Sequence, residues 1–272
     1  HRIIFQYWRE ESMTDFDILQ TLDPHVVIEC LNPESLLYVP SIEDEVEEAM
    51  EASDKVKTQK WYPVYIFVCH TGTLLSSLIQ LWTKDQYSHS LISFDASMTQ
   101  MYSFGRKKLN DDISITGASN GFAVDDINND FYTKWKKNIK YATFVIFVTK
   151  KQRAAMIKKV KFFIENQVNF TYDMDGLFAY AAHLPHEKQW SYFCSGFVAD
   201  VLQTGEVLGK KRSYSSYSPQ DLAELPMAYK VNEGDDFSEY RERKTKAKVK
   251  SAWNKFLKES HIESDTNTLV LV

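Results

Sequence analysis

Cys194 is the residue of this sequence best placed to act as a nucleophile. Apolar residues follow it at offsets of three, four, seven and eight positions: Phe197, Val198, Val201 and Leu202. This spacing predicts an amphipathic helix that begins at Cys194 and ends at Gly205. A thiol in the first helical turn lies at the positive end of the helix dipole, which stabilises the thiolate and lowers its pKa. The same pattern also suits a cysteine that is simply a small buried apolar residue.

A cysteine nucleophile needs a nearby base, and usually a third polar group that orients this base. Seven histidines are available. His89 differs from the others because it lies near the start of a β-type run, residues 87–95, where a strand would hold its ring in place. His70 directly follows another predicted strand. The remaining five lie near the chain ends or in polar stretches: His1, His25, His183, His186 and His261.

The elements that must position these residues are a set of short strands and amphipathic helices. Runs of β-branched and aromatic residues predict strands at 64–69, 87–95, 101–105, 121–124 and 141–148. Helical spacing of apolar residues predicts helices at 73–82, 151–168, 194–204 and 241–258. Ser218 followed by Pro219 is typical of a helix start, which predicts a short helix at 219–225. Strands and helices in this order indicate an α+β domain.

The composition bounds the classes of function. The 272 residues include 44% hydrophobic side chains, enough for a sizeable core, and the formal charge of -5 argues against a general nucleic-acid binder. Three cysteines without framework spacing, Cys30, Cys69 and Cys194, argue against a disulfide scaffold. No motif supports a nucleotide, a metal or another cofactor. We find no membrane-spanning run and no signal peptide, and therefore expect a cytoplasmic or virion-associated protein, although the start at His1 suits a piece of a longer polypeptide.

Charge is distributed unevenly, which indicates three regions: an acidic N-terminal extension at 1–60, a compact domain at 61–230, and a basic C-terminal helix and tail at 231–272. In the first region Ser41 is a suitable cap for an acidic helix. The basic helix could bind an acidic partner, nucleic acid or an anionic surface, and either charged region could serve an assembly partner. For both helices an ordinary solvated face is the favoured interpretation.

Several short motifs occur in an order that resembles the circularly permuted papain-like hydrolases. They are Gly-Thr-Leu-Leu-Ser-Ser-Leu-Ile-Gln-Leu-Trp-Thr (72–83), Tyr-Ser-His-Ser-Leu-Ile-Ser (87–93), Met-Tyr-Ser-Phe-Gly-Arg (101–106), Tyr-Asp (172–173), Phe-Cys-Ser-Gly-Phe-Val (193–198) and Ser-Pro-Gln-Asp-Leu (218–222). These hydrolases are relatives of the NlpC-type cell-wall peptidases and of the lecithin retinol acyltransferase group. The resemblance covers about residues 62–227 and implies an antiparallel sheet packed against the cysteine helix.

The resemblance implies a role for each candidate site residue. Cys194 becomes the nucleophile and His89 the general base, and the position of the third polar residue matches Ser103. A hydroxyl there is a departure, because an acid, an amide or a second imidazole would hold His89 better. Either Ser103 serves weakly, or another group such as Asp95 does so, or catalysis has been lost. The expected walls of the substrate groove are His70, Tyr87 and Tyr172.

Three functions are compatible with this sequence. The first is a cysteine peptidase or amidase that cleaves amide bonds through an acyl-thioenzyme, with peptidoglycan stem peptides as the substrate class that the resemblance implies. The second is a structural or interaction protein that keeps the fold without the chemistry, for instance a component of a bacteriophage particle. The third is acyl transfer from a lipid or thioester, which uses the same pair of residues and is disfavoured by the absence of a membrane segment.

Overall fold

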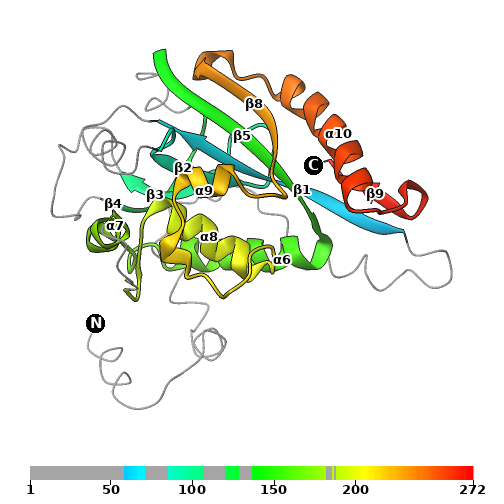
Figure 1. Ribbon diagram of the computed structural model, residues 1–272. Coiled ribbons are helices and arrows are strands. Elements are labelled where there is room, and N and C mark those ends of the chain that lie inside the picture. Colours follow the sequence, from blue (N-terminus) through cyan, green and yellow to red (C-terminus); the bar gives the residue numbers. More distant parts are fainter. Residues whose placement is uncertain are drawn as a thin grey trace. The chain divides into compact units, whose positions relative to one another are not determined.

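A seven-stranded sheet forms the centre of the computed structural model (Figure 1), in the order β4-β3-β2-β1-β5-β8 with β9 beside β1. The structure describes residues 58–70, 85–106, 120–128, 137–181, 186 and 188–271. All of them belong to one compact unit that spans residues 42–272. Each strand pair of this sheet is antiparallel except β1 with β9, so the described part of the chain is an α+β protein with a mostly antiparallel sheet.

Five strands of the sheet follow the predicted runs, and four of these are longer than expected, whereas β8 and β9 were not predicted. Their bounds are β1 (Gln59–Cys69), β2 (His89–Ser93), β3 (Met101–Arg106), β4 (Asn120–Asp125), β5 (Lys137–Thr149), β8 (Tyr229–Asp236) and β9 (Asn267–Leu269). Successive side chains of a strand point to opposite faces. In β1, Val64, Ile66 and Val68 pack on one face, whereas Tyr65, Phe67 and Cys69 pack on the other. Both faces are therefore covered, which explains why the run is apolar without alternation.

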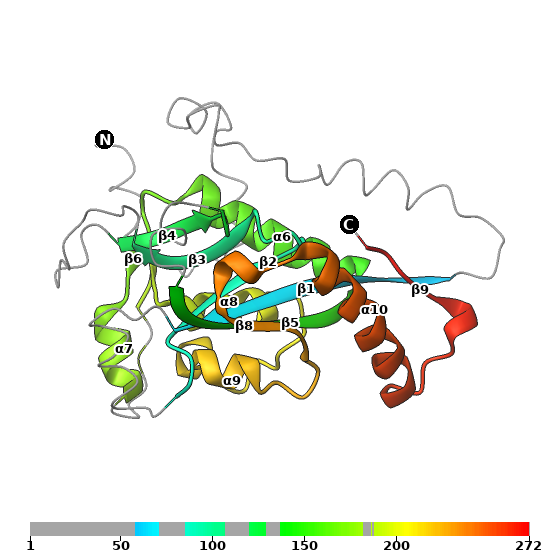
Figure 2. The same cartoon turned by 90° about the horizontal axis from the view of Figure 1, so that it is seen from above.

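Helices cover the two faces of the sheet (Figures 1 and 2). The residues that pack with Val64 and Ile66 come from α6 (Lys150–Glu165), α8 (Cys194–Thr204) and α9 (Pro219–Ala223). The opposite face is covered by α10 (Glu242–Glu259), through Val249, Ala252 and Trp253. Beside these layers, β6 (Thr171–Tyr172) and β7 (Ser191–Tyr192) form a small parallel sheet, and α7 (Met174–Ala181) follows β6.

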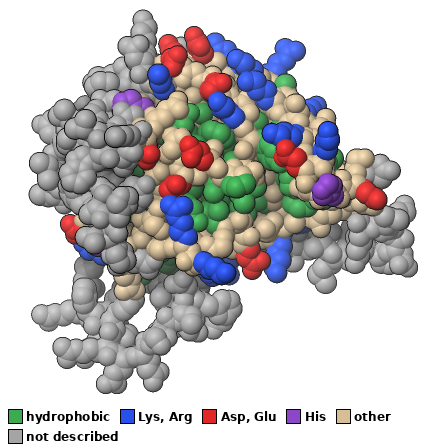
Figure 3. All heavy atoms as spheres, in the orientation of Figure 1, with side chains coloured by type: hydrophobic (Ala, Val, Ile, Leu, Met, Phe, Trp, Pro, Cys, Tyr) green, Lys and Arg blue, Asp and Glu red, His purple; other side chains and the backbone are tan. Residues whose placement is uncertain are grey.

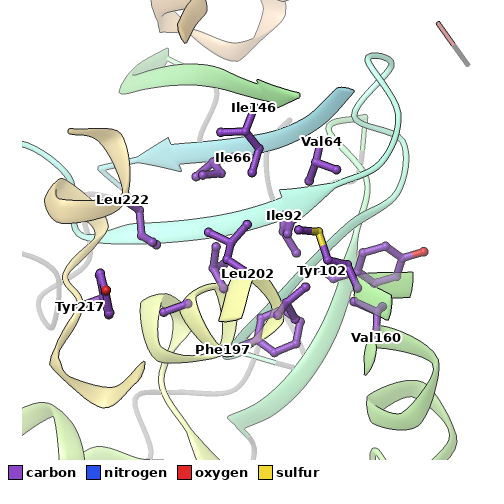
Figure 4. Packing of buried hydrophobic residues seen from close by; sticks show 14 of the residues in the cluster. Val64, Ile66, Ile92, Tyr102, Ile146, Val160, Phe197, Leu202, Tyr217 and Leu222 are labelled. Carbon is purple, nitrogen blue, oxygen red and sulfur yellow. The ribbon is translucent and has the colours of Figure 1, made fainter. Parts of the chain in front are cut away.

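The core between α8 and the sheet sets the position of the cysteine helix. Phe197 and Leu202 of α8 are fully buried and lie toward Ile66 and Ile92 of the sheet (Figure 4). The ring of Phe197 also contacts Phe104 of β3, with centroids 5.5 Å apart. Burying several large apolar side chains stabilises such an interface by about 1.5–3 kcal/mol for each of them. The N-terminus of α8 is thus held against β2 and β3.

Local signals place several helix ends where the sequence predicts them. Ser218 caps α9 by accepting from the Asp221 N–H, and the Asp221 carboxylate accepts from the Ser218 N–H, which together form a capping box. Thr149 and Gln152 form the same arrangement at α6. Gly205 follows the last residue of α8, as its position in the sequence predicts.

The expected boundary at residue 230 does not separate the C-terminal region from the domain. It falls inside β8, which pairs with β5 along the edge of the central sheet. The segment beyond it contributes α10 to the core and β9 to the sheet, because the apolar stripe of the basic helix is buried against Phe147 and Trp61. The predicted helix at 73–82 and the acidic helix after Ser41 lie outside the described residues.

Candidate active site around Cys194

Cys194 is the first residue of α8 and is 4% exposed. The small sheet of β6 and β7 fixes the chain just before it, because Tyr172 pairs with Tyr192 and the Asp173 N–H donates to the Tyr192 carbonyl at 2.9 Å. Phe193, the residue before the helix, supplies no side-chain cap. Phe193 therefore offers no side-chain oxygen to the N–H groups of the first turn. These N–H groups can instead face the sulfur and an incoming anion.

Ser90 of β2 is a neighbour of the thiol on the sheet. The backbone N–H groups of Ser90, Ser195 and Cys194 itself lie near enough to the sulfur to lower the pKa of the thiol. The Ser90 hydroxyl also lies near enough to lower this pKa, yet it has no hydrogen-bond partner of good geometry within the described residues. Ser90 is fully buried. Sequence reasoning missed it, although its place next to His89 is a usable signal.

His89 and Ser103 meet as the sequence analysis expects. The Ser103 Oγ lies 3.4 Å from the His89 Nε2, and the Ser103 hydroxyl donates its hydrogen to the Ser90 carbonyl at 2.7 Å. A hydroxyl has one hydrogen, so Ser103 faces the imidazole as an acceptor. The proton of neutral His89 is then on Nε2, and Nδ1 keeps the lone pair that a general base needs.

Ser90, which lies beside the thiol, and His89 direct their side chains to opposite faces of β2 at its seam with β3. Alternation along β2 directs the Ser90 side chain toward α8, and it directs the His89 ring to the face of Leu91 and Ser103. The regular ladder between the two strands is limited to the Ile92–Tyr102 pair, so the Ser90 N–H is not used in it. The ring also lies beside Gly105, where an added Cβ would be 3.5 Å from the His89 Cε1. The absence of a side chain at Gly105 leaves the seam open there.

Burial keeps both members of the pair uncharged. It raises the pKa of the Cys194 thiol, and this effect outweighs the N–H groups and the hydroxyl that lower it. Burial also lowers the pKa of His89 to about 4. The expectation of a lowered thiol pKa is therefore wrong for the folded chain. The cost of desolvating the thiolate exceeds the stabilisation that the helix N-terminus provides. At neutral pH the site holds a thiol and a neutral imidazole.

Tyr172 lies on the helix side of the site. Burial raises the pKa of its phenol well above the usual range, and the nearby Cys194 and Asp173 add to this effect. The next residue, Asp173, is buried and accepts from the Gly176 N–H at 2.9 Å and from the His186 Nε2 at 3.2 Å. Tyr172 is thus close to the thiol, and it is neutral at any working pH. The Asp173–His186 pair is a second feature that sequence reasoning did not find.

His70 and Tyr87, the other expected groove residues, lie where β1 ends and the chain enters β2. The His70 Nδ1 is 3.2 Å from the Ser88 Oγ, and burial together with the charge of Lys140 lowers the pKa of His70. Tyr87 is 6% exposed and belongs to the same core as α8, so it is mainly a packing residue. Asp95, the alternative partner for His89, instead accepts from the Ser97 N–H at 3.0 Å in the turn at the far end of β2.

The comparisons with known proteins add no family to this geometry. No protein-family model matches the chain, and no curated protein matches it. Within the described residues, no group of three or more His, Cys, Asp and Glu side chains is arranged to hold a metal ion. No described helix is long and apolar enough to cross a membrane.

Proposed function

We propose that this protein is a cysteine-dependent hydrolase that cleaves amide bonds through an acyl-thioenzyme, with a permuted papain-like fold. The observation that supports the proposal is the proximity of the Ser90 backbone N–H to the Cys194 thiol, which is close enough to lower the pKa of the thiol. This N–H belongs to the peptide bond between His89 and Ser90. A sulfur close to it also lies near the His89 Cα, because this N–H and that Cα belong to the same peptide unit. Among the described residues no contact joins the imidazole to the thiol, so the proposed proton transfer requires the His89 ring to turn toward α8.

The proposed reaction uses the groups of this site in fixed roles. His89 Nδ1 takes the proton of the Cys194 thiol while the sulfur attacks the carbonyl carbon of the substrate. The N–H of Cys194 and a neighbouring N–H of the first turn of α8 stabilise the resulting oxyanion. The imidazolium returns its proton to the leaving amine, and a thioester remains on Cys194. Water, deprotonated by His89, attacks this thioester and releases the acid and the free thiol.

The substrate class follows from the resemblance noted in the sequence. Peptidoglycan stem peptides and similar isopeptides are the first substrates to test. The decisive comparison is the turnover of the Cys194→Ala and Cys69→Ala variants, because both replace a free buried cysteine. Hydrolysis that disappears in the first variant and persists in the second supports the proposal. Equal activity in both, with both proteins folded, would exclude Cys194 as the nucleophile.

A structural or interaction protein without chemistry is the second candidate. The neutral state of the site favours it, because a raised thiol pKa and an imidazole pKa of about 4 disfavour a thiolate-imidazolium pair. Under this alternative, Cys194→Ala changes packing alone, by about 1 kcal/mol or less. Mass spectrometry of the trapped intermediate distinguishes acyl transfer from a lipid or thioester from amide hydrolysis and from a purely structural role. A fatty-acyl adduct on Cys194 indicates transfer, and a peptide adduct indicates hydrolysis of amides.

A further inference from the structure

Helix α10 carries an excess of positive charge on a rigid support. It has seven Lys and Arg residues and two Glu, and each Glu forms an i,i+4 ion pair, Lys246 with Glu242 at 2.8 Å and Lys255 with Glu259 at 3.6 Å. Five further cationic side chains are exposed: Arg243, Lys244, Lys248, Lys250 and Lys258. Within the part of the chain that the structure describes, none of these five forms an ion pair. Figure 3 shows Lys and Arg side chains gathered over this region.

The cationic side chains lie in two rows along the outer side of the helix. Lys244, Lys248 and Lys255 share one side, and Arg243 and Lys250 share the other, as their helical spacing requires. Three exposed uncharged residues lie between the rows, Ala247, Ser251 and Asn254, and Lys258 lies in the same strip near the end of the helix. We call the two rows and this strip the cationic face of α10. Its inner side is fixed, because Thr245, Val249, Ala252 and Trp253 are buried. Such a face matches a narrow anionic chain that lies along the helix.

The chain carries an acidic segment of complementary charge, and this segment precedes a strand that contacts α10. Residues 43–54 contain seven acidic residues and no basic one. The segment ends shortly before β1, and Trp61 of β1 contacts α10, with ring centroids 5.0 Å from Phe256 and 6.3 Å from Trp253. Residues 55–58 span at most about 14 Å when extended, and α10 is about 27 Å long. The tether therefore delivers the acidic segment to the helix at a high effective concentration.

We propose that the cationic face of α10 is a binding surface for an acidic peptide, and that its occupant is the chain's own segment 43–54. The contact is electrostatic and exposed, so it weakens as salt rises above physiological strength. Release of the segment would then open the same face to other polyanions. This inference concerns the face of the sheet opposite α8, and it is independent of the proposed chemistry at Cys194.

Zero-length cross-linking of the full chain tests the proposal, because a carbodiimide joins carboxylates to amines only where they touch. We expect cross-links from residues 43–54 to Lys244, Lys248 and Lys250, and their loss at about 0.5 M salt. The matched control is α6, another lysine-rich helix, with exposed Lys151 and Lys158. Equal cross-linking to α6, or none to α10, would overturn the proposal. Mixed isotope-labelled chains identify the occupant, and links only between copies would overturn the assignment to the same chain.

A charge-neutralised variant gives a second, independent readout. In this variant Glu43, Glu45, Glu47, Glu48 and Glu51 become Gln, which neutralises five of the seven acidic residues of the occupant and leaves the described residues unchanged. We expect its retention on heparin to increase at low salt relative to wild type, because α10 is uncovered. Equal retention of the two proteins would contradict the proposal. Binding of duplex DNA or anionic vesicles should likewise be weaker for wild type than for the variant. Equally tight binding by the two proteins would indicate a different occupant and would overturn the proposal.

Discussion

The Nε2 of His89 lies 3.4 Å from the Oγ of Ser103, and the Ser103 hydroxyl donates to the Ser90 carbonyl at 2.7 Å. These two contacts decide the tautomer of His89, because the only hydrogen of Ser103 is already in use. The imidazole is held by a hydroxyl and not by a carboxylate, so little negative charge is available to stabilise an imidazolium. The same hydroxyl thus orients the ring and leaves its pKa low.

Removal of the Ser103 hydroxyl should disturb the tautomer. In Ser103→Ala the Nε2–H loses its acceptor, and we expect His89 to populate both neutral tautomers in ¹⁵N spectra of the imidazole. Turnover of an amide substrate should fall about 10- to 100-fold, as for other residues that orient a reactive side chain. Ser103→Thr keeps the hydroxyl and serves as the control. An unchanged tautomer in Ser103→Ala would show that Ser103 does not orient the ring.

Ser90 should tune the reactivity of the thiol. The Ser90 hydroxyl lowers the pKa of Cys194, so Ser90→Ala should raise this pKa and slow alkylation by iodoacetamide at about pH 8 several-fold. Ser88→Ala is the matched control, because Ser88 is a nearby buried serine whose hydroxyl contacts His70. The free energy of unfolding should stay the same or rise by up to about 1 kcal/mol, since an unpaired buried hydroxyl is removed. Faster labelling in Ser90→Ala would contradict this role.

Burial of neutral His89 should make the fold less stable in mild acid. The pKa of His89 is lowered from its ordinary 6.5 to about 4. Between these values the unfolded chain binds a proton that the folded chain does not, so the free energy of unfolding falls as pH falls from about 6.5 toward 4. The loss is at most about 3 kcal/mol, and less where water reaches the partly exposed ring.

Denaturant titrations of wild type and His89→Asn across this pH range measure the effect. Wild type should lose stability more steeply than the variant, and the difference between the two curves isolates the contribution of His89 from that of the carboxylates. Parallel curves would mean that His89 has an ordinary pKa in the folded protein.

Asp173 should stabilise the segment before the cysteine helix chiefly as a cap of α7. Its carboxylate accepts from the Gly176 N–H at 2.9 Å, so Asp173→Ala should cost about 1–2 kcal/mol in the free energy of unfolding. His186→Ala leaves the cap in place and removes a partly exposed ion pair, which should cost less than about 1 kcal/mol. Chemical denaturation of both variants checks the order. A larger loss in His186→Ala would assign the stability to the ion pair.

Gly176 offers an independent check of this arrangement. An added Cβ there would clash with the Asp173 Oδ2 and would lie 2.9 Å from the His186 Cδ2. Gly176→Ala should therefore displace the carboxylate and destabilise the protein, although alanine is the better helix former. A stabilising effect of this substitution would show that the Asp173 side chain lies elsewhere.

Local sequence patterns predict much of the fold. The apolar spacing after Cys194 predicts α8 and its end at Gly205, and Ser218 followed by Pro219 predicts the start of α9. Such signals act between residues a few positions apart, and they operate in almost any tertiary setting. The division at residue 230 fails for the opposite reason. Charge composition marks the basic C-terminal region as separate, but its apolar stripe completes the core on the second face of the sheet.

By itself the sequence determined that a thiol begins a buried helix and that a histidine begins a strand of an antiparallel sheet. Only the tertiary structure decided how these residues behave. The Ser103 contact with His89 and the Ser90 N–H on the thiol depend on strand register and on the docking of α8 against β2. The helix dipole is a local effect, and it predicts a reactive thiolate. Desolvation depends on every neighbour that excludes water, and in the folded chain it keeps the thiol protonated and the imidazole neutral.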